Sequence, residues 1–117
     1  MLIRKKTNIV PQPIEHCQGG EGVVMMERLL DAPKEMLGKG RAYVRHTLNP
    51  GVSIGMHTHE HEMETMTIVS GHAIHTINGE VQHLEPGDII AAEPGDNHGI
   101  ACEGNEPLVL IAQVLYE

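Results

Sequence analysis

The sequence has no phenylalanine and no tryptophan, and only two tyrosines among its 117 residues. Its hydrophobic core must therefore be aliphatic, with valine, isoleucine, leucine and seven methionines supplying the volume. The two cysteines, Cys17 and Cys102, are too few for a disulfide framework. Such sparse cysteine use is typical of free thiols in the cytoplasm, which is the location we expect.

Long apolar runs and an excess of positive charge are also missing. The longest apolar run, residues 108–112, is far shorter than the roughly 20 residues that cross a bilayer as a helix. The basic start, MLIRKK, is not followed by the apolar run of a signal peptide. Sixteen acidic residues against eight basic ones give a net charge of −8. Such a surface repels phosphate backbones and anionic lipids, so we expect neither nucleic acid nor membrane as a partner.

Turn-forming residues divide the chain into short segments, since it contains thirteen glycines and seven prolines. Asp31 is expected to cap one short helical turn that ends at Leu37, and Asn78-Gly79 predicts a two-residue hairpin. Strands are predicted at residues 23–30, 41–48, around 57–59, 64–70, 72–77, 81–84, 89–92, 98–102 and 108–116, with a further short strand at 9–10. Eight to ten short strands with almost no helix predict one all-β domain over residues 1–117, a sandwich or a barrel.

One stretch, residues 51–71, has the spacing of a metal site. His57 and His59 are two residues apart, so in a strand their rings lie on the same face. Glu64 follows after a bend and can add a carboxylate oxygen. Neutral imidazoles with one carboxylate suit divalent transition metals. His61 continues the alternate series and is the competing candidate ligand.

This stretch and a second one, residues 87–102, resemble the two sequence motifs of the cupin superfamily. The first, G-x5-H-x-H-x4-E-x6-G, is matched at every position by Gly51, His57, His59, Glu64 and Gly71. The second, G-x5-P-x-G-x2-H-x3-N, is matched by Gly87, Gly95 and His98, whereas Glu93 and Cys102 replace its proline and asparagine. The chain is thus similar to small single-domain cupins of the conserved-barrel type, with residues 1–22 as an N-terminal arm or strand.

The resemblance implies a double-stranded β-helix, or jelly-roll barrel, around one divalent metal ion. Its ligands would be His57, His59, Glu64 and His98, and the metal would be Fe, Mn, Ni, Co, Cu or Zn. Four protein ligands leave up to two positions for a small-molecule substrate or dioxygen. The resemblance also implies a homodimer, in which a strand at residues 2–10 could pair with the partner subunit.

Strand parity suggests which residues surround the metal. Two histidines are ambiguous: His75 either lines the pocket or faces solvent, and His46 is either a pocket residue or, as we favour, a satisfied interior histidine. Glu93 and His75 are the candidates for acid–base catalysis. The full set of expected pocket residues is Met66, Ile68, Ala73, His75, Ile100, Cys102 and His46.

Three functions are compatible with these features. We favour a metal-dependent enzyme acting on a small oxygen-bearing metabolite, with dioxygenase-type oxidation first. The alternatives are a non-redox isomerase or lyase acting on a sugar or small acid, and a module that binds a metal or small ligand without turnover. Arg41 and Arg45 share a strand face, and an anionic substrate is favoured if that face lines the cavity.

Overall fold

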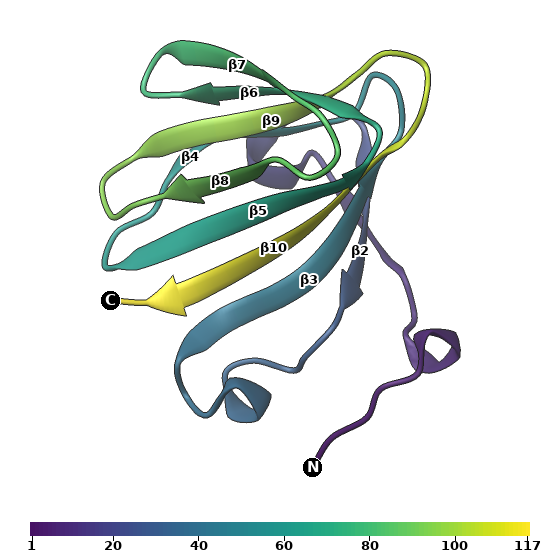
Figure 1. Ribbon diagram of the computed structural model, residues 1–117, viewed down its shortest axis with the longest axis vertical. Helices are drawn as coiled ribbons and strands as arrows, with labels where there is room; N and C mark the ends of the chain where they lie inside the picture. The colour runs from purple at the N-terminus through teal and green to yellow at the C-terminus, as the bar shows by residue number, and fades with distance from the viewer.

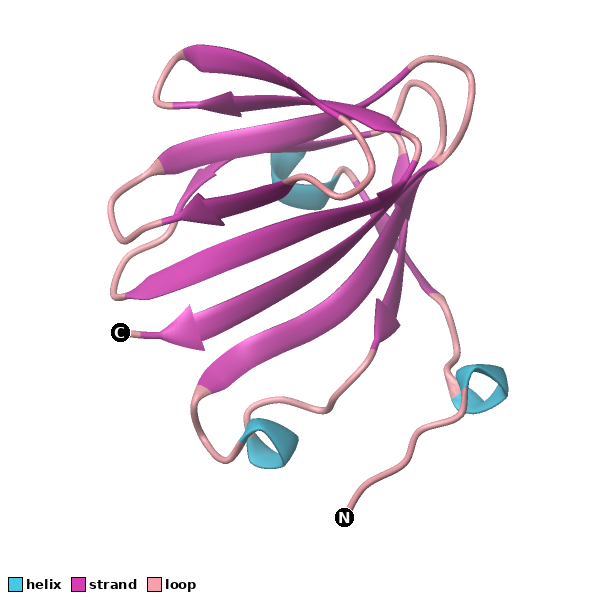
Figure 2. Cartoon of the chain, viewed as in Figure 1, coloured by secondary structure: helices cyan, strands magenta, loops and turns pink.

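The computed structural model describes all residues, 1–117, and consists almost entirely of antiparallel strands (Figures 1 and 2). Three single 3₁₀ turns accompany them: η1 (Lys6–Asn8), η2 (Cys17–Gly19) and η3 (Lys34–Met36). The strands are β1 (Gln12–Glu15), β2 (Val23–Arg28), β3 (Gly40–Leu48), β4 (Ser53–Thr58), β5 (Glu62–Ser70), β6 (His72–Ile77), β7 (Glu80–Leu84), β8 (Ile89–Ala92), β9 (Asn97–Glu103) and β10 (Leu108–Tyr116). The all-β prediction is confirmed.

The strands form two sheets that share one core. The larger sheet has the order β1-β2-β3-β10-β5-β8, and the smaller has the order β4-β9-β6-β7. Aliphatic residues of both inner faces meet between them, among them Leu48, Met66 and Leu110 from the larger sheet and Ile54 and Ile100 from the smaller. Without phenylalanine or tryptophan, the core is thus filled by branched aliphatic side chains and methionine, which pack closely between the inner faces of the two sheets.

Most predicted strands occur where expected, and the N-terminal region is the exception. Residues 9–10 form no strand, and residues 2–10 contain only the turn η1, so the prediction of a strand there was wrong. The first strand, β1, includes Pro13, which the sheet tolerates because β1 is an edge strand. The Asn78-Gly79 hairpin is present, with positive φ at both residues.

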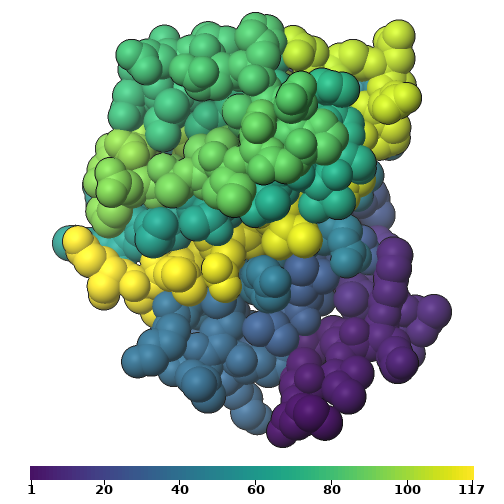
Figure 3. All heavy atoms as spheres, viewed as in Figure 1, coloured from purple at the N-terminus to yellow at the C-terminus, as the bar shows by residue number.

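The segment after β2 is tied to the N-terminus, beside which it lies in Figure 3. The Arg4 guanidinium donates to the Leu29 carbonyl oxygen and to both carboxylate oxygens of Glu35. The side chain of Asp31 does not cap η3. Instead the Glu35 carboxylate accepts a hydrogen bond from the Asp31 amide. The side chain that stabilises the turn therefore comes from within the turn and binds the backbone before it.

The turn η2 lies directly on β4, with backbone against backbone. A Cβ atom at Gly55 would overlap the carbonyl oxygen of Gln18, and one at Gly20 would overlap the carbonyl oxygen of Ser53. Glycine is required at both positions because no side chain fits between the two segments. This contact places Cys17 and Gln18 at the wall of the barrel's pocket. None of the helical turns is long or apolar enough to cross a membrane.

Candidate metal centre

The four motif side chains come from both sheets and meet inside the barrel. His57 on β4 and His98 on β9 are direct cross-strand partners in the smaller sheet. Glu64 extends from β5 in the larger sheet, and His59 follows β4 in the connection to β5. Their ligand atoms all lie within 4.8 Å of one another. That spread is close to the roughly 4 Å between opposite ligands of an ion with bonds of about 2.0–2.1 Å.

The three imidazoles present the same nitrogen to Glu64. His98 Nε2 lies 2.9 Å from Glu64 Oε1, His59 Nε2 lies 3.0 Å from it, and His57 Nε2 lies 3.5 Å from it. Glu64, His59 and His98 are buried, and His57 is half-buried. The cluster therefore joins the two sheets at one shielded point.

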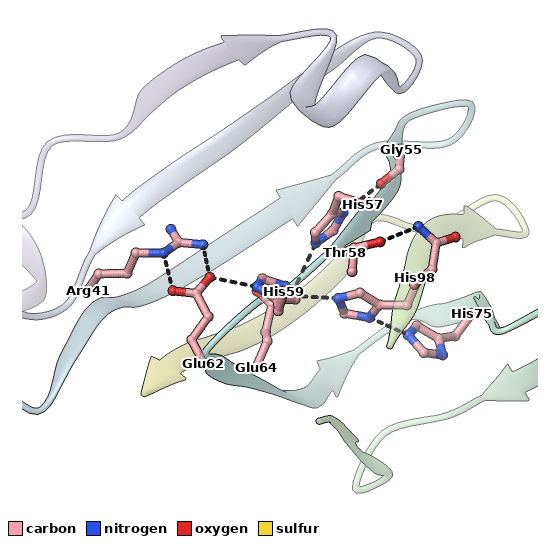
Figure 4. A network of polar contacts seen from close by, with 10 residues as sticks. Arg41, Gly55, His57, Thr58, His59, Glu62, Glu64, His75 and His98 are labelled. Carbon is pink, nitrogen blue, oxygen red and sulfur yellow. Dashed lines mark hydrogen bonds and ion pairs between the residues drawn. The ribbon is translucent and has the colours of Figure 1, made fainter. Parts of the chain in front are cut away.

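Each imidazole is held by its other nitrogen, Nδ1 (Figure 4). His57 Nδ1 donates to the Gly55 carbonyl oxygen at 2.7 Å, and His59 Nδ1 donates to Glu62 Oε1 at 2.8 Å. His98 Nδ1 lies 2.9 Å from His75 Nε2. Such contacts fix ring orientation and tautomer in metal sites. With the proton on Nδ1, each Nε2 has a lone pair directed at the cluster centre.

Arg41 extends this network to the protein surface. Its guanidinium donates to both carboxylate oxygens of Glu62, at 2.8 and 2.7 Å. These bonds to Arg41, more than the contact with His59, lower the pKa of Glu62 to about 2. Glu62 is therefore a carboxylate at neutral pH and acts as a permanent acceptor for the His59 ring.

The charges in the cluster call for a cation. Burial opposes ionisation of Glu64, but the neighbouring His57 and His98 rings lower its pKa well below the ordinary value. Burial likewise disfavours a charged His57, but its hydrogen bonds to Glu64 and Gly55 raise its pKa above the ordinary value. Three lone pairs and a carboxylate facing one point repel one another unless a proton or metal ion lies between them.

The geometry of His98 fits a metal ion better than a proton. Its Nε2 is fully shielded from solvent and has no hydrogen-bond partner, although Glu64 Oε1 is only 2.9 Å away. The short distance without hydrogen-bond geometry means that the lone pair is not directed at this oxygen. A buried nitrogen of this kind is costly unless it has a ligand. The donor set of three imidazoles and one carboxylate therefore fits a divalent transition metal.

His61 lies outside the cluster. Its side chain is 88% exposed, and its Nδ1 lies 3.3 Å from Glu117 Oε2. The residue has a positive φ, which turns the chain between β4 and β5 and breaks the alternate series of histidines. Glu64 instead returns into the barrel at the start of β5.

The two candidates for acid–base catalysis lie elsewhere. His75 is buried on β6 but does not line the pocket, because its ring packs behind His98. Burial and the nearby His98 lower the pKa of His75 to about 4, so it is neutral at ordinary pH. Glu93 is exposed in the turn between β8 and β9 and does not line the pocket either.

A pocket of about 300 Å³ opens beside the metal cluster, and three of the four ligands, His57, His59 and Glu64, line it. Of the expected pocket residues, Met66 and His46 line it. Ile68, Ala73 and Ile100 are instead packed in the core, and Cys102 donates to the Glu106 carbonyl oxygen. The alternation along the strands correctly predicts that Ile68 and Ala73 face the interior of the barrel. Around these two residues, however, the interior is filled by packed side chains and leaves no pocket.

Most of the rest of the pocket wall comes from segments before the first motif; Ile54, within that motif, and Val114, on β10, are the exceptions. These residues include Ile14, Cys17, Gln18, Met26, Arg28 and Tyr43. The alternation of buried residues along β2, with Val24 and Met26 inward, is the sequence signal that could have located Arg28 at the pocket. Nothing local to residues 14–18 indicates their position, which depends on the contact between η2 and β4.

Arg41 and Arg45, both on β3, lie in different surroundings. Arg41 lines the pocket, whereas Arg45 pairs with the buried Glu27 at 3.2 Å. The reason is a register shift between β3 and β10: Ala42 pairs with Val114 but Gly40 pairs with Leu115, so Arg41 lies in a bulge and leaves the alternation. The prediction that both arginines share one face was wrong.

Comparison with known proteins supports this reading of fold and cluster. A family model described as "Cupin domain" matches residues 44–114, well over half of the chain. The chain is a cupin. An oxalate-binding protein from Thermotoga maritima is 32% identical to it over 114 residues, which cover 97% of this chain and 93% of that protein.

Solved structures agree on the jelly-roll fold. This cupin superposes on the crystal structure of a predicted oxalate decarboxylase from Thermotoga maritima with a TM-score of 0.95 and 32% identity, over 99% of this chain and 100% of that one. KdgF from Halomonas sp. matches with a TM-score of 0.75 and 18% identity, over 97% of this chain and 94% of that one. The double-stranded β-helix expected from the two motifs is confirmed.

Proposed function

We propose that this cupin holds one divalent transition metal between His57, His59, Glu64 and His98 and uses it to bind a small acid through oxygen atoms. The observation that carries the proposal is the convergence of three Nε2 atoms on Glu64 Oε1 at the edge of a pocket. Once bound, the ion would supply Lewis acidity and open positions for oxygen ligands. The ligand class is supported by the relative described as oxalate-binding.

The electrostatics of the pocket support an anionic ligand. Glu64 offsets one charge of a divalent ion, so the loaded centre has a net charge of about +1. Arg28 lines the pocket and donates to the neutral side-chain oxygen of Gln12, so its positive charge is not cancelled in that contact. A carboxylate entering the pocket therefore meets positive charge at both positions. The one acidic lining residue besides Glu64 is Asp31, whose carboxylate lies 3.8 Å from the Arg4 guanidinium, which partly offsets its charge.

Metal loading and acid binding can be measured separately. Elemental analysis of the protein as isolated should find about one transition metal per chain, and removal with a chelator should lower the melting temperature. At a free metal concentration 100 times Kd, binding stabilises the folded state by about 2.7 kcal/mol. Calorimetric titration with oxalate should show binding to the loaded protein and none to the chelator-treated protein. Equal oxalate binding by both forms would contradict the proposal.

Catalysis at the metal centre is a separate question from binding of the acid. The dioxygenase activity favoured by the sequence stays a prediction, and so does the isomerase or lyase alternative. The side chains with exchangeable protons that line the pocket besides the ligands include Cys17, Tyr43 and His46. Oxygen consumption by the Fe(II)-loaded protein, measured across β-dicarbonyls, thiols and catechols, tests the oxidative reading. The expected homodimer is tested by gel filtration.

A further inference from the structure

The pocket is larger than a two-carbon acid requires. Its volume of about 300 Å³ is at the lower end of the range for pockets that enclose drug-sized ligands, about 300–1,000 Å³. Away from the metal cluster, its wall is largely aliphatic, with Met26, Val44, Ile54 and Met66 among the lining residues. Under the proposed function, on which this inference rests, the space fits an acid that chelates at one end and has a short carbon chain beyond it.

His46 is a polar residue on this aliphatic wall. It lies on β3 between Val44 and Leu48 and is paired across the sheet with Met26 and Leu110. Its ring lines the pocket, yet its Nδ1 is fully shielded and has no hydrogen-bond partner. Burial lowers the pKa of His46, so the ring is neutral near pH 7 and has one N–H donor.

The position of the ring proton follows from the cost of leaving a group unpaired. A shielded N–H without an acceptor is rarer in proteins than a shielded acceptor without a donor. The unpartnered Nδ1 of His46 is therefore the lone-pair nitrogen, and the proton is on Nε2. Of the two ring nitrogens, only Nδ1 is both shielded and unpaired, and Nε2 makes no hydrogen bond within the chain, so we take the Nε2 edge as the one that reaches the pocket. That edge offers a hydrogen-bond donor and needs an oxygen acceptor.

A positive charge lies on the same wall. Arg28 pairs with Val44 across β2 and β3, whereas Met26 pairs with His46, so Arg28 and His46 are diagonal neighbours on one face of the strand pair. Both side chains line the pocket. In contrast to Arg41, whose guanidinium is bound to the Glu62 carboxylate, the Arg28 guanidinium donates its hydrogen bond to a neutral oxygen, that of the Gln12 side chain. An acceptor held by His46 is thus favoured when it is negatively charged.

We infer that His46 is a specificity-determining residue, whose Nε2–H donates to a second carboxylate of the ligand, remote from the metal. The ligand class is then a 2-oxo or 2-hydroxy dicarboxylic acid: the oxygens at one end chelate the metal, a short aliphatic chain contacts the apolar wall, and the other carboxylate meets His46 with Arg28 nearby. Oxalate fills only the first of these positions.

Three acids separate the two ends of the pocket. Oxalate has the chelating group alone, 2-oxopentanoate adds the carbon chain, and 2-oxoglutarate adds the second carboxylate. Titration calorimetry with the Mn²⁺-loaded protein measures each Kd; the protein has no tryptophan to report binding by fluorescence. We expect 2-oxoglutarate to bind at least about tenfold more tightly than 2-oxopentanoate, as for a hydrogen bond to a charged group.

Variants assign that preference to one side chain. His46→Leu should remove about tenfold of the 2-oxoglutarate affinity and leave the Kd of oxalate, 2-oxopentanoate and Mn²⁺ within about twofold of wild type. His46→Gln keeps an N–H donor and should retain part of the preference. His72→Leu is the matched control, because His72 is exposed on β6 and does not line the pocket.

The possible results distinguish this inference from the proposed function. Oxalate binding without a preference for 2-oxoglutarate in the wild type would overturn the inference alone, and this holds even if His46→Leu does not fold. An equal loss of all three acids in His46→Leu would also overturn it, because that pattern indicates general damage to the pocket. Binding of no acid by the Mn²⁺-loaded protein would overturn both.

Discussion

The imidazoles of the metal cluster and that of His46 are the same chemical group inside one barrel, but their surroundings differ. In His57, His59 and His98, Nδ1 contacts a partner within the chain, and Nε2 lies within 3.5 Å of Glu64 Oε1. In His46 the order is reversed: Nδ1 has no partner, and the other edge lines the pocket. When Nδ1 of a neutral ring donates its proton to a partner, Nε2 has a lone pair that can bind a cation. When Nδ1 has no partner and is the lone-pair nitrogen, Nε2 has the proton and can donate it to an anion. The neighbours therefore decide what each imidazole can bind.

The largest effect should follow the loss of one ligand ring. His98→Ala removes an Nε2 that is buried and has no hydrogen-bond partner. We expect its affinity for Zn²⁺ to fall by more than about 100-fold, the upper end of the effect of removing only a supporting residue. Competition titration with a chromogenic chelator measures this, and His72→Ala provides the control. Retention of one tightly bound ion in His98→Ala would show that the four groups do not form the site.

A smaller loss should follow removal of a supporting contact. Glu62→Ala leaves His59 Nδ1 without its acceptor, so the ring can turn and Nε2 loses its direction. We expect Zn²⁺ affinity to fall by about 10- to 100-fold. Glu62→Gln retains an acceptor oxygen and should recover part of the loss. If the alanine and glutamine variants bind zinc as tightly as wild type, the Nδ1 contacts do not set ligand strength.

The affinity for metal should rise with pH through the neutral range. The pKa of His57 is raised in the metal-free folded protein, so its proton competes with the ion. A charged His57 stabilises the metal-free fold fully below the unfolded pKa, and this contribution is lost as the pH rises through the folded pKa. Below that pKa, the affinity should fall about tenfold per pH unit. Titrations between about pH 6 and 8 measure the slope, and a flat profile would contradict competition at His57.

The smallest effect should come from the imidazole that lies outside the cluster. His46→Leu leaves the four ligands and their Nδ1 partners in place, so Zn²⁺ affinity should change by less than about twofold. The free energy of unfolding should rise by about 1 kcal/mol, because a shielded and unpaired nitrogen is removed. Urea denaturation of the metal-free protein measures this. A large loss of zinc affinity would mean that the two kinds of imidazole are not independent.

The sequence predicts the ligands better than it predicts their surroundings. The short spacings of His57, His59 and Glu64 within residues 51–71 indicate which way their side chains point. His98 lies in the separate stretch 87–102 and is assigned from its place in the second cupin motif. His75 and Glu62 could not be assigned as supporting residues in the same way. The contact between His75 and His98 depends on which strand lies next to β9, and Glu62 binds His59 only because the positive φ at His61 turns the chain back.

The same limit applies to the walls of the barrel. Alternation along the chain tells which side of a strand faces inward, but it does not tell where the interior is filled and where it is hollow. Ile68 and Met66 have the same parity, yet only Met66 lines the pocket. A bulge of one residue at Arg41 was enough to separate it from Arg45. Nine of the ten strands were predictable because turn residues mark their ends. The exception is β1 (Gln12–Glu15), because its Pro13 is expected to end the strand predicted at residues 9–10.

Gly55 links two parts of the molecule through its backbone alone. Its carbonyl oxygen orients the His57 ring, and its missing side chain leaves room for the turn that presents Cys17 and Gln18 to the pocket. A ligand that displaces this turn would push on the residue that aims a metal-binding nitrogen. We therefore expect occupancy of the pocket to change the strength of metal binding through the Gly55 peptide unit.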